Sequence, residues 1–221
     1  MDDDSALEAR LRALIPSTEI LPKGMVRRGA EEVARDLLGC FLVSTVDGAL
    51  VGGRIVETEA YLGREDPASH AAVRAGRTSR NAPMFGPGGT AYVYLVYGMH
   101  WCLNVVTGVA GDPQAVLLRA IEPQLGDETM RVRRGRDQDL TNGPARLSSA
   151  LGVDGSLNGH DFEGPPLLLL AGVRPDEIDV GVSGRIGVRY ARDWPLRFFL
   201  RGHPDVSRRR PDPAASRHVL P

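Results

Sequence analysis

The sequence contains a single lysine, Lys23, among its 27 lysines and arginines, and only two cysteines, Cys40 and Cys102. Two distant cysteines supply neither a disulfide framework nor a tightly spaced zinc site, so both thiols are expected to be reduced and buried. Arginine provides almost all of the positive charge, and guanidinium groups can bind phosphate in a bidentate manner. A genome biased towards arginine codons is the simpler reason for the lysine shortage.

Long hydrophobic runs and a strong net charge are absent as well. The longest apolar stretch, around residues 165–173, is far too short to cross a bilayer. The acidic amino terminus, residues 1–5, has none of the features of a signal peptide. The formal net charge of -1 gives no global indication of a nucleic-acid partner. These features predict a soluble, cytoplasmic protein with no membrane partner.

The 221 residues fit one large domain with its own core. An acidic extension over residues 1–20, with a short helix over 2–15, is expected before the domain at 21–202, and a basic tail over 203–221 after it. Strands with helices scattered between them predict an α+β fold with a mostly antiparallel sheet. Helices are expected at 30–38, 127–136 and 143–151, and strands at 40–46, 51–62, 90–97, 101–107, 115–122, 166–170, 185–188 and 196–200.

Two carboxylates stand in the apolar segment Arg54-Ile-Val-Glu-Thr-Glu-Ala-Tyr-Leu-Gly63. In a regular strand both acids share one face with Ile55 and Tyr61. Burying a carboxylate costs several kcal/mol unless it is paired, so chemistry is indicated at these positions. Either Glu57 or Glu59 could act as a general base. Their spacing does not say which.

Two further roles for these acids stay open. In the first, one acid pairs with a buried arginine such as Arg119 or Arg54, because a lone buried arginine needs an anionic partner or a phosphate. In the second, a metal ion is bound, although none of the available ligands has the spacing of a recognised site. Those ligands are Glu57, Glu59, Asp66, His70 and His100.

Flat side chains lie near the acids in sequence or on the neighbouring expected strands: Tyr61, His70, Tyr92 and Tyr94. Such rings suit a planar heterocycle, because stacking contributes about 1–3 kcal/mol per base. Tyrosines that simply fill a core are the alternative. The long polar segment over residues 63–89 is more often functional than idle in a compact domain.

The segment Tyr97-Gly-Met-His-Trp101 places large side chains at an expected turn, where polar residues are usual. An exposed apolar wedge of this kind can enter between base pairs and unstack a duplex. A turn covered by another element is the alternative.

Together these segments resemble the alkyladenine (3-methyladenine) DNA glycosylase family. The likeness covers roughly residues 21–202, which would form the glycosylase domain, and its Glu-Thr-Glu-Ala-Tyr-Leu motif is specific. The matching stretches are residues 34–39, 54–63, 80–81, 84–85, 89–99, 102–104, 116–123, 142–144 and 195–198. The resemblance implies a curved sheet with surrounding helices and a protruding β-hairpin.

The resemblance also implies residue roles. It selects Glu59 as the general base that activates water, with Arg119 helping to hold the water and the target nucleotide. The residues implied to enclose a flipped base are Tyr61, His70 and Tyr94, and Asn104 is implied to clash with the amine of guanine. The implied DNA contacts are Tyr97, which fills the gap in the duplex, with Met99, His100 and Arg77.

The implied substrate is damaged double-stranded DNA carrying alkylated or deaminated purines, such as 3-methyladenine, 7-methylguanine, hypoxanthine and ethenoadenine. No metal or other cofactor is implied, and the enzyme is expected to be a nucleoid-associated bacterial monomer. The motif region has no lysine to form a Schiff base, so an abasic site without strand cleavage is expected. Three rivals remain: a non-catalytic binder of damaged DNA, a metal-dependent hydrolase using Glu57, Glu59 and His70, and an RNA-binding module.

Overall fold

The computed structural model describes residue 11, residues 19–72 and residues 76–207. Apart from Leu11, the helix expected over residues 2–15 lies outside the described residues. The helices are α2 (Lys23–Val26), α3 (Ala30–Asp36), α4 (Asp127–Arg134) and α5 (Pro144–Leu151), with single-turn 3₁₀ helices η1 (Val46–Gly48), η2 (Gly63–Glu65), η3 (Ala82–Phe85), η4 (Gly155–Leu157) and η5 (Glu177–Asp179). The strands are β1 (Phe41–Ser44), β2 (Val51–Tyr61), β3 (Ala91–Val96), β4 (His100–Thr107), β5 (Gln114–Leu125), β6 (Glu163–Gly164), β7 (Leu167–Leu170), β8 (Val180–Ser183) and β9 (Arg197–Leu200).

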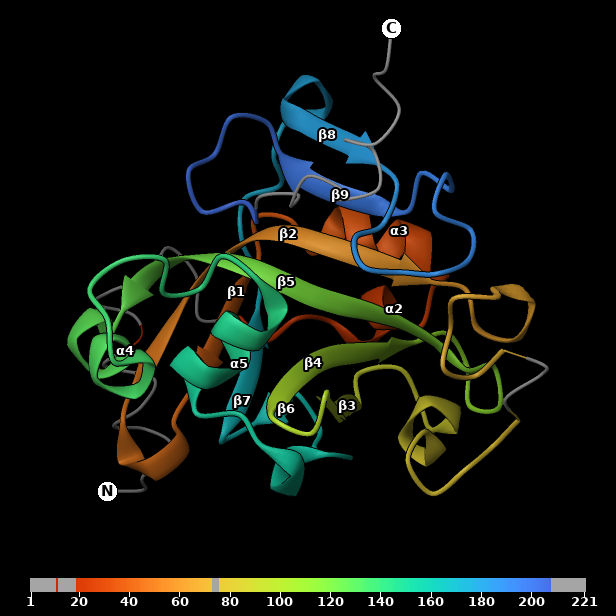
Figure 1. Cartoon of the computed structure of the whole chain (residues 1–221), viewed down its shortest axis with the longest axis horizontal. Coiled ribbons are helices and arrows are strands. Elements are labelled where there is room, and N and C mark those ends of the chain that lie inside the picture. Colours follow the sequence, from red (N-terminus) through yellow and green to blue (C-terminus); the bar gives the residue numbers. More distant parts are fainter. Residues whose placement is uncertain (1–10, 12–18, 73–75, 208–221) are drawn as a thin grey trace, which may run out of the picture.

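These strands form one antiparallel sheet in the order β3-β4-β5-β2-β1-β7-β6, to which β8 and β9 are joined through β2 (Figure 1). Strand β2 is central, because β5 pairs along one of its edges while β1 and then β9 pair along the other. Helix α3 packs against β2 and β5, and α5 packs against β4 and β5. A curved sheet with helices around it confirms the predicted α+β fold of a single domain.

Helix α3 shows why the predicted helices form where they do. Two glutamates in its first turn suit the positive end of the helix dipole. Val33 and Leu37, four residues apart, are fully buried in the main core. The helical segment stops at Gly39, whose φ of 89° favours glycine. A Cβ at Gly39 would also lie only 2.1 Å from the carbonyl oxygen of Val173, so a larger residue does not fit there.

Strand β2 contains a β-bulge between Ile55 and Glu57, and its register with β5 shifts again before Thr58. Ile55 packs in the main core, and the hydroxyl of Thr58 donates to a carbonyl of α3 at 2.8 Å. Glu57, Glu59 and Tyr61 alternate with Thr58 and face the other way. The prediction that Ile55 shares their face is wrong, because the extra residue at a bulge reverses the alternation.

The strand predicted over residues 185–188 is also wrong, since β8 ends at Ser183 and residues 184–196 contain no strand. The side chain of Arg185 is buried in an ion pair with Asp66, and the backbone N–H of Ile186 donates to the carboxylate of Glu59. The N–H of Ile186 is therefore not available for a strand ladder. The other predicted elements between residues 30 and 200 are confirmed, with shifted boundaries.

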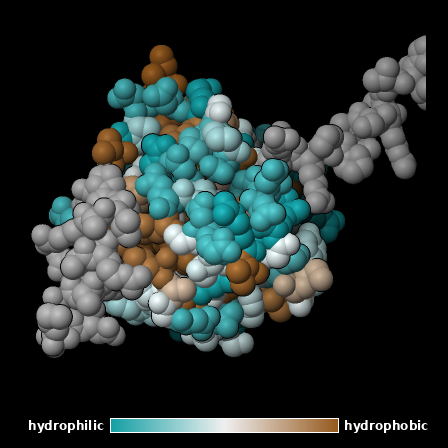
Figure 2. Space-filling model, turned by 90° about the vertical axis from the view of Figure 1, so that its left-hand side faces the viewer, coloured by the Kyte–Doolittle hydropathy of each residue, from teal (hydrophilic) through white to brown (hydrophobic). Residues whose placement is uncertain are grey.

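The face that carries α4 is mainly hydrophilic (Figure 2). Helix α4 buries Met130 and exposes Asp127, which pairs with the half-buried Arg131 one turn later at 3.6 Å. Over the described ranges, no helix is both long enough and apolar enough to cross a membrane.

Candidate functional site

A cavity of about 600 Å³ opens between the β3–β4 hairpin, β5 and the segment that follows β8. Its volume lies in the usual range for small-molecule sites. Six of the predicted site residues line this cavity: Tyr61, His70, Tyr94, Tyr97, Asn104 and Arg119. Three others, Arg77, Met99 and His100, are not among the described residues that line it. The structure therefore brings together side chains from β2, β3, β4, β5 and the loop after η2.

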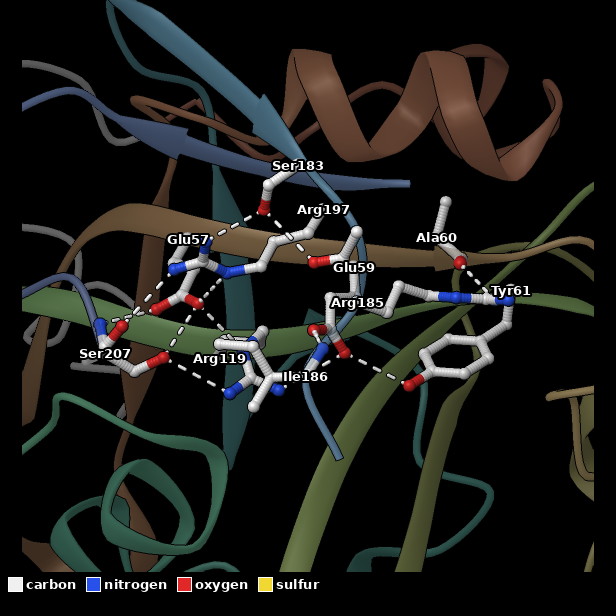
Figure 3. Close-up of polar contacts among 11 residues, drawn as sticks. Glu57, Glu59, Ala60, Tyr61, Arg119, Ser183, Arg185, Ile186, Arg197 and Ser207 are labelled. Carbon is white, nitrogen blue, oxygen red and sulfur yellow. Dashed lines mark hydrogen bonds and ion pairs between the residues drawn. The ribbon is translucent and has the colours of Figure 1, made fainter. Parts of the chain in front are cut away.

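Glu59 is fully buried and is not among the described residues that line this cavity, so its carboxylate lies behind the cavity wall. Figure 3 shows the groups around it. One carboxylate oxygen, Oε1, accepts the backbone N–H of Ile186 at 2.7 Å. The other, Oε2, accepts the hydroxyl of Tyr61 at 3.1 Å and lies 3.2 Å from a guanidinium nitrogen of Arg119. Tyr61, Arg119 and Ile186 all line the cavity. The three groups that hold the carboxylate of Glu59 therefore also form part of the cavity wall.

Glu57 has a different environment, although it is only two residues away. Its carboxylate accepts from Arg119 at 2.8 Å, from Arg197 at 2.7 Å, and from both the backbone N–H and the hydroxyl of Ser207 at 2.7 and 2.8 Å (Figure 3). Burial alone would raise the pKa of Glu57, but the two arginines and Ser207 outweigh it and lower the pKa. Glu57 is thus the acid that pairs with a buried arginine, an alternative that the sequence left open.

Arg119 joins the two acids. Its Nε donates to Glu57 and its Nη1 pairs with Glu59, while Nη2 donates to the hydroxyl of Ser207 at 3.2 Å. Burial disfavours the cation, but the two carboxylates raise the pKa of Arg119 above its usual value. The guanidinium of Arg119 is therefore permanently charged. One of its edges contacts the two acids, and Arg119 also lines the cavity.

Three rings form another side of the cavity. His70 and Tyr94 meet edge to face with centroids 4.5 Å apart, and Nδ1 of His70 is 2.8 Å from the hydroxyl of Tyr92. His70 is an exposed residue that lines the cavity, yet partial burial of its ring lowers its pKa to about 4, and the charge of Arg80 contributes. Burial raises the pKa of Tyr92 to about 12. All three rings are uncharged at neutral pH, which suits stacking on a flat ligand.

His70 should therefore titrate far below an ordinary histidine. Because its folded-state pKa of about 4 lies below the ordinary value of 6.5, the unfolded chain binds a proton between these pH values that the folded chain does not. The stability that His70 contributes is present above pH 6.5 and is lost as the pH falls towards 4. We expect an NMR titration midpoint near pH 4, and a shallower loss of stability over this window in His70→Gln. A midpoint at the ordinary value would contradict the packing described.

The β3–β4 hairpin presents its turn to solvent. Tyr97 adopts a left-handed φ of 52°, and the N–H of Met99 donates to the carbonyl of Val96 at 3.2 Å. Tyr97 is 92% exposed and Met99 69% exposed. Trp101, which the sequence placed in the same wedge, instead packs against the main core beside Gly155, because it lies inside β4 rather than in the turn. The exposed wedge is shorter than predicted.

Several residues of this region were missed from the sequence. Arg197 and Ser207 hold Glu57, and Arg185 with Asp66 holds the segment behind Glu59. Ser207 is 6% exposed, although the sequence assigned residues 203–221 to a tail; the domain boundaries themselves stay predictions. An arginine between Leu196 and two phenylalanines was a usable signal, of the kind that singled out Arg119.

Arg77 is exposed, and its guanidinium lies 5.6 Å from the centroid of the Phe85 ring. In the part of the chain that the structure describes, no group of three or more His, Cys, Asp or Glu side chains is arranged to hold a metal ion. Asp66, one of the ligands considered from the sequence, is engaged by Arg185.

Comparison with known proteins gives the class of this protein, which is a hydrolase that acts on N-glycosyl bonds. A family model described as Methylpurine-DNA glycosylase (MPG) matches residues 24–204, and the chain belongs to that family. This confirms the family resemblance of the sequence.

Several curated relatives carry the provisional name 3-methyladenine DNA glycosylase. The protein of Carboxydothermus hydrogenoformans is 46% identical over 193 residues, which cover 86% of this chain and 100% of that protein. The protein of Methanoculleus marisnigri is 46% identical over 194 residues, covering 86% of this chain and 99% of the relative. The protein of Rhodopseudomonas palustris is 47% identical over 182 residues, covering 81% of this chain and 86% of the relative.

Proposed function

We propose that this glycosylase flips alkylated or deaminated purines out of double-stranded DNA and hydrolyses their N-glycosidic bond as a monomer, leaving an abasic site. The proposed substrates are 3-methyladenine, 7-methylguanine, hypoxanthine and ethenoadenine. The observation that carries the proposal is the position of Glu59: a buried carboxylate behind the wall of a ring-lined cavity, with Arg119 at its side.

In the proposed reaction Glu59 accepts a proton from a water molecule aimed at C1′ of the damaged nucleotide. The water oxygen bonds to C1′, the bond between C1′ and the purine nitrogen breaks, and the bonding pair leaves with the base. A cationic methylated purine departs as a neutral molecule. Arg119 keeps the carboxylate of Glu59 in place, because its Nη1 lies 3.2 Å from Oε2.

The proposed base-binding side chains are Tyr61, His70 and Tyr94. Their rings are uncharged at neutral pH, so they can stack on neutral bases and attract cationic ones through their π faces. Asn104 is proposed to exclude guanine. Its amide is 3% exposed, lines the cavity and donates to the carbonyl of Tyr92 at 2.9 Å, so it is held in one orientation against an incoming exocyclic amine.

The hairpin turn supplies the proposed wedge. Flipping a nucleotide costs a few kcal/mol and leaves a gap in the duplex. Tyr97 lines the cavity mouth and is almost fully exposed, so its ring can enter the gap while the base occupies the cavity. The exposed side chains of Met99, His100 and Arg77 are proposed to contact the flanking DNA.

The test is a base-release assay on duplex oligonucleotides that carry one lesion each. We expect 3-methyladenine to be released, with weaker release of hypoxanthine and ethenoadenine, because a neutral base is a poorer leaving group. The product strand should stay intact until alkali is added, since no lysine is present at the site to form a Schiff base. Normal guanine in the same duplex is the control. Tight binding of the lesions without release of any base would show that the protein binds damaged DNA without catalysis, and would contradict the proposal.

A further inference from the structure

Residues 186–190 line the cavity, and we call them the wall segment. Arg185, directly before it, does not belong to the described lining residues and is only 2% exposed. We infer that Arg185 is a positioning residue, which aims the carboxylate of Glu59 through the wall segment and through Tyr61. This inference rests on the proposed function, in which Glu59 activates water.

The first support is the pair that fixes Arg185. Its guanidinium binds both carboxylate oxygens of Asp66, one of them at 2.8 Å, and donates to the carbonyl of Ala60 at 3.0 Å. Asp66 in turn accepts the backbone N–H groups of Leu62 at 3.1 Å and Ala68 at 2.9 Å. Both charged side chains are fully buried. The pair therefore ties the start of the wall segment to the end of β2 and to the loop that carries His70.

The second support is the environment on either side of Arg185. Gly184 lies so close to the backbone of Arg192 that an added Cβ would be 2.0 Å from its carbonyl oxygen. The guanidinium carbon of Arg185 lies 4.7 Å from the centroid of the Tyr61 ring, within the range of a cation–π contact. The backbone before Arg185 is thus confined, and its side chain also braces Tyr61.

These contacts lead to Glu59 along two routes. The peptide that follows Arg185 supplies the N–H of Ile186, which lies 2.7 Å from Oε1 of Glu59. The ring braced by Arg185 supplies the hydroxyl of Tyr61, which lies 3.1 Å from Oε2. Three donors hold Glu59 among the residues that the structure describes, and of these only Arg119 is independent of Arg185. A catalytic group has to be held within about 0.5 Å of its productive geometry, so this arrangement bears directly on rate.

Arg185→Lys tests the inference, because lysine keeps the charge but loses the planar fork and the stacking surface. We expect the single-turnover rate of base release at saturating protein to fall by about 10–100-fold, the scale of a 1 Å misplacement. The Kd for the same lesion-bearing duplex should change much less than the rate, because Arg185 itself does not line the cavity. Arg54→Lys is the matched control, since Arg54 lies on β2, the strand of Glu59, and pairs with Glu122 of β5 at a partly exposed site. It should leave both quantities unchanged.

A purely structural role predicts another pattern: a lower Tm with a normal rate for the folded protein, or equal losses in rate and binding. Either result would overturn the inference. Asp66→Asn serves as the second variant where Arg185→Lys does not fold, and a wild-type rate for folded Asp66→Asn would overturn it too. Wild type and Glu59→Gln belong in the same series. A wild-type protein that releases no base refutes the proposed function, whereas a normal rate in Arg185→Lys refutes the positioning role alone.

Discussion

Glu59→Gln is expected to reduce base release from methylated duplex DNA by about 10²–10⁴-fold, the usual contribution of a general base. Glutamine has nearly the same shape but cannot take a proton from water. Its amide oxygen can still accept the N–H of Ile186, so the wall of the cavity should stay in place. Binding of the damaged duplex should therefore survive. Single-turnover rates and the Kd of the variant, measured on one oligonucleotide, separate the two effects.

Glu122→Gln is the matched control for this loss of charge. Glu122 is a partly exposed carboxylate that pairs with Arg54 at 2.9 Å, and its neutralisation should leave base release unchanged. Full activity in Glu59→Gln would remove Glu59 from the mechanism. Loss of activity in a folded Glu57→Gln protein, with full activity in Glu59→Gln, would instead make Glu57 the base. Loss of binding together with activity in folded Glu59→Gln would mean that Glu59 holds the DNA rather than the water.

Much of the central sheet was predictable because its signals are local. The apolar run at 51–62 and the aromatic run at 90–97 each form a strand, and the Tyr97-Gly98 turn joins β3 to β4. The bulge in β2 was not predictable, because it depends on how β2 pairs with β5 some 60 residues later in the chain. A one-residue shift of that pairing decides which side chains face the core.

The candidate site divides in the same way. The motif around Glu59 and the nearby rings stand out as polar or aromatic groups in strand patterns, and the structure gathers them at one cavity. The ion pairs behind them join residues far apart in sequence: 119 residues separate Asp66 from Arg185, and 140 separate Glu57 from Arg197. No periodicity or short motif reports such a contact. The expected strand at 185–188 failed for this reason, since its residues serve these distant partners.

The largest effect on stability is expected from Glu57→Gln. Glu57 receives four hydrogen bonds and balances the charges of two buried arginines, Arg119 and Arg197. Removing one partner of a buried ion pair costs about 3–5 kcal/mol, because the remaining charge stays buried without compensation. We expect the free energy of unfolding to fall by about this amount, whereas Glu122→Gln at the partly exposed pair should cost less than about 1 kcal/mol.

The pH dependence gives an independent check on Glu57. Its pKa is lower in the folded protein than the ordinary value of 4.5, so its contribution is complete above that pH and is lost as the pH falls through the folded-state value. The difference in the free energy of unfolding between wild type and Glu57→Gln should therefore become smaller in acid. Chemical denaturation at neutral pH and at successively lower pH measures this directly. A constant difference across the series would mean that Glu57 contributes by its shape and not by its charge, and that Arg119 does not need it as a counterion.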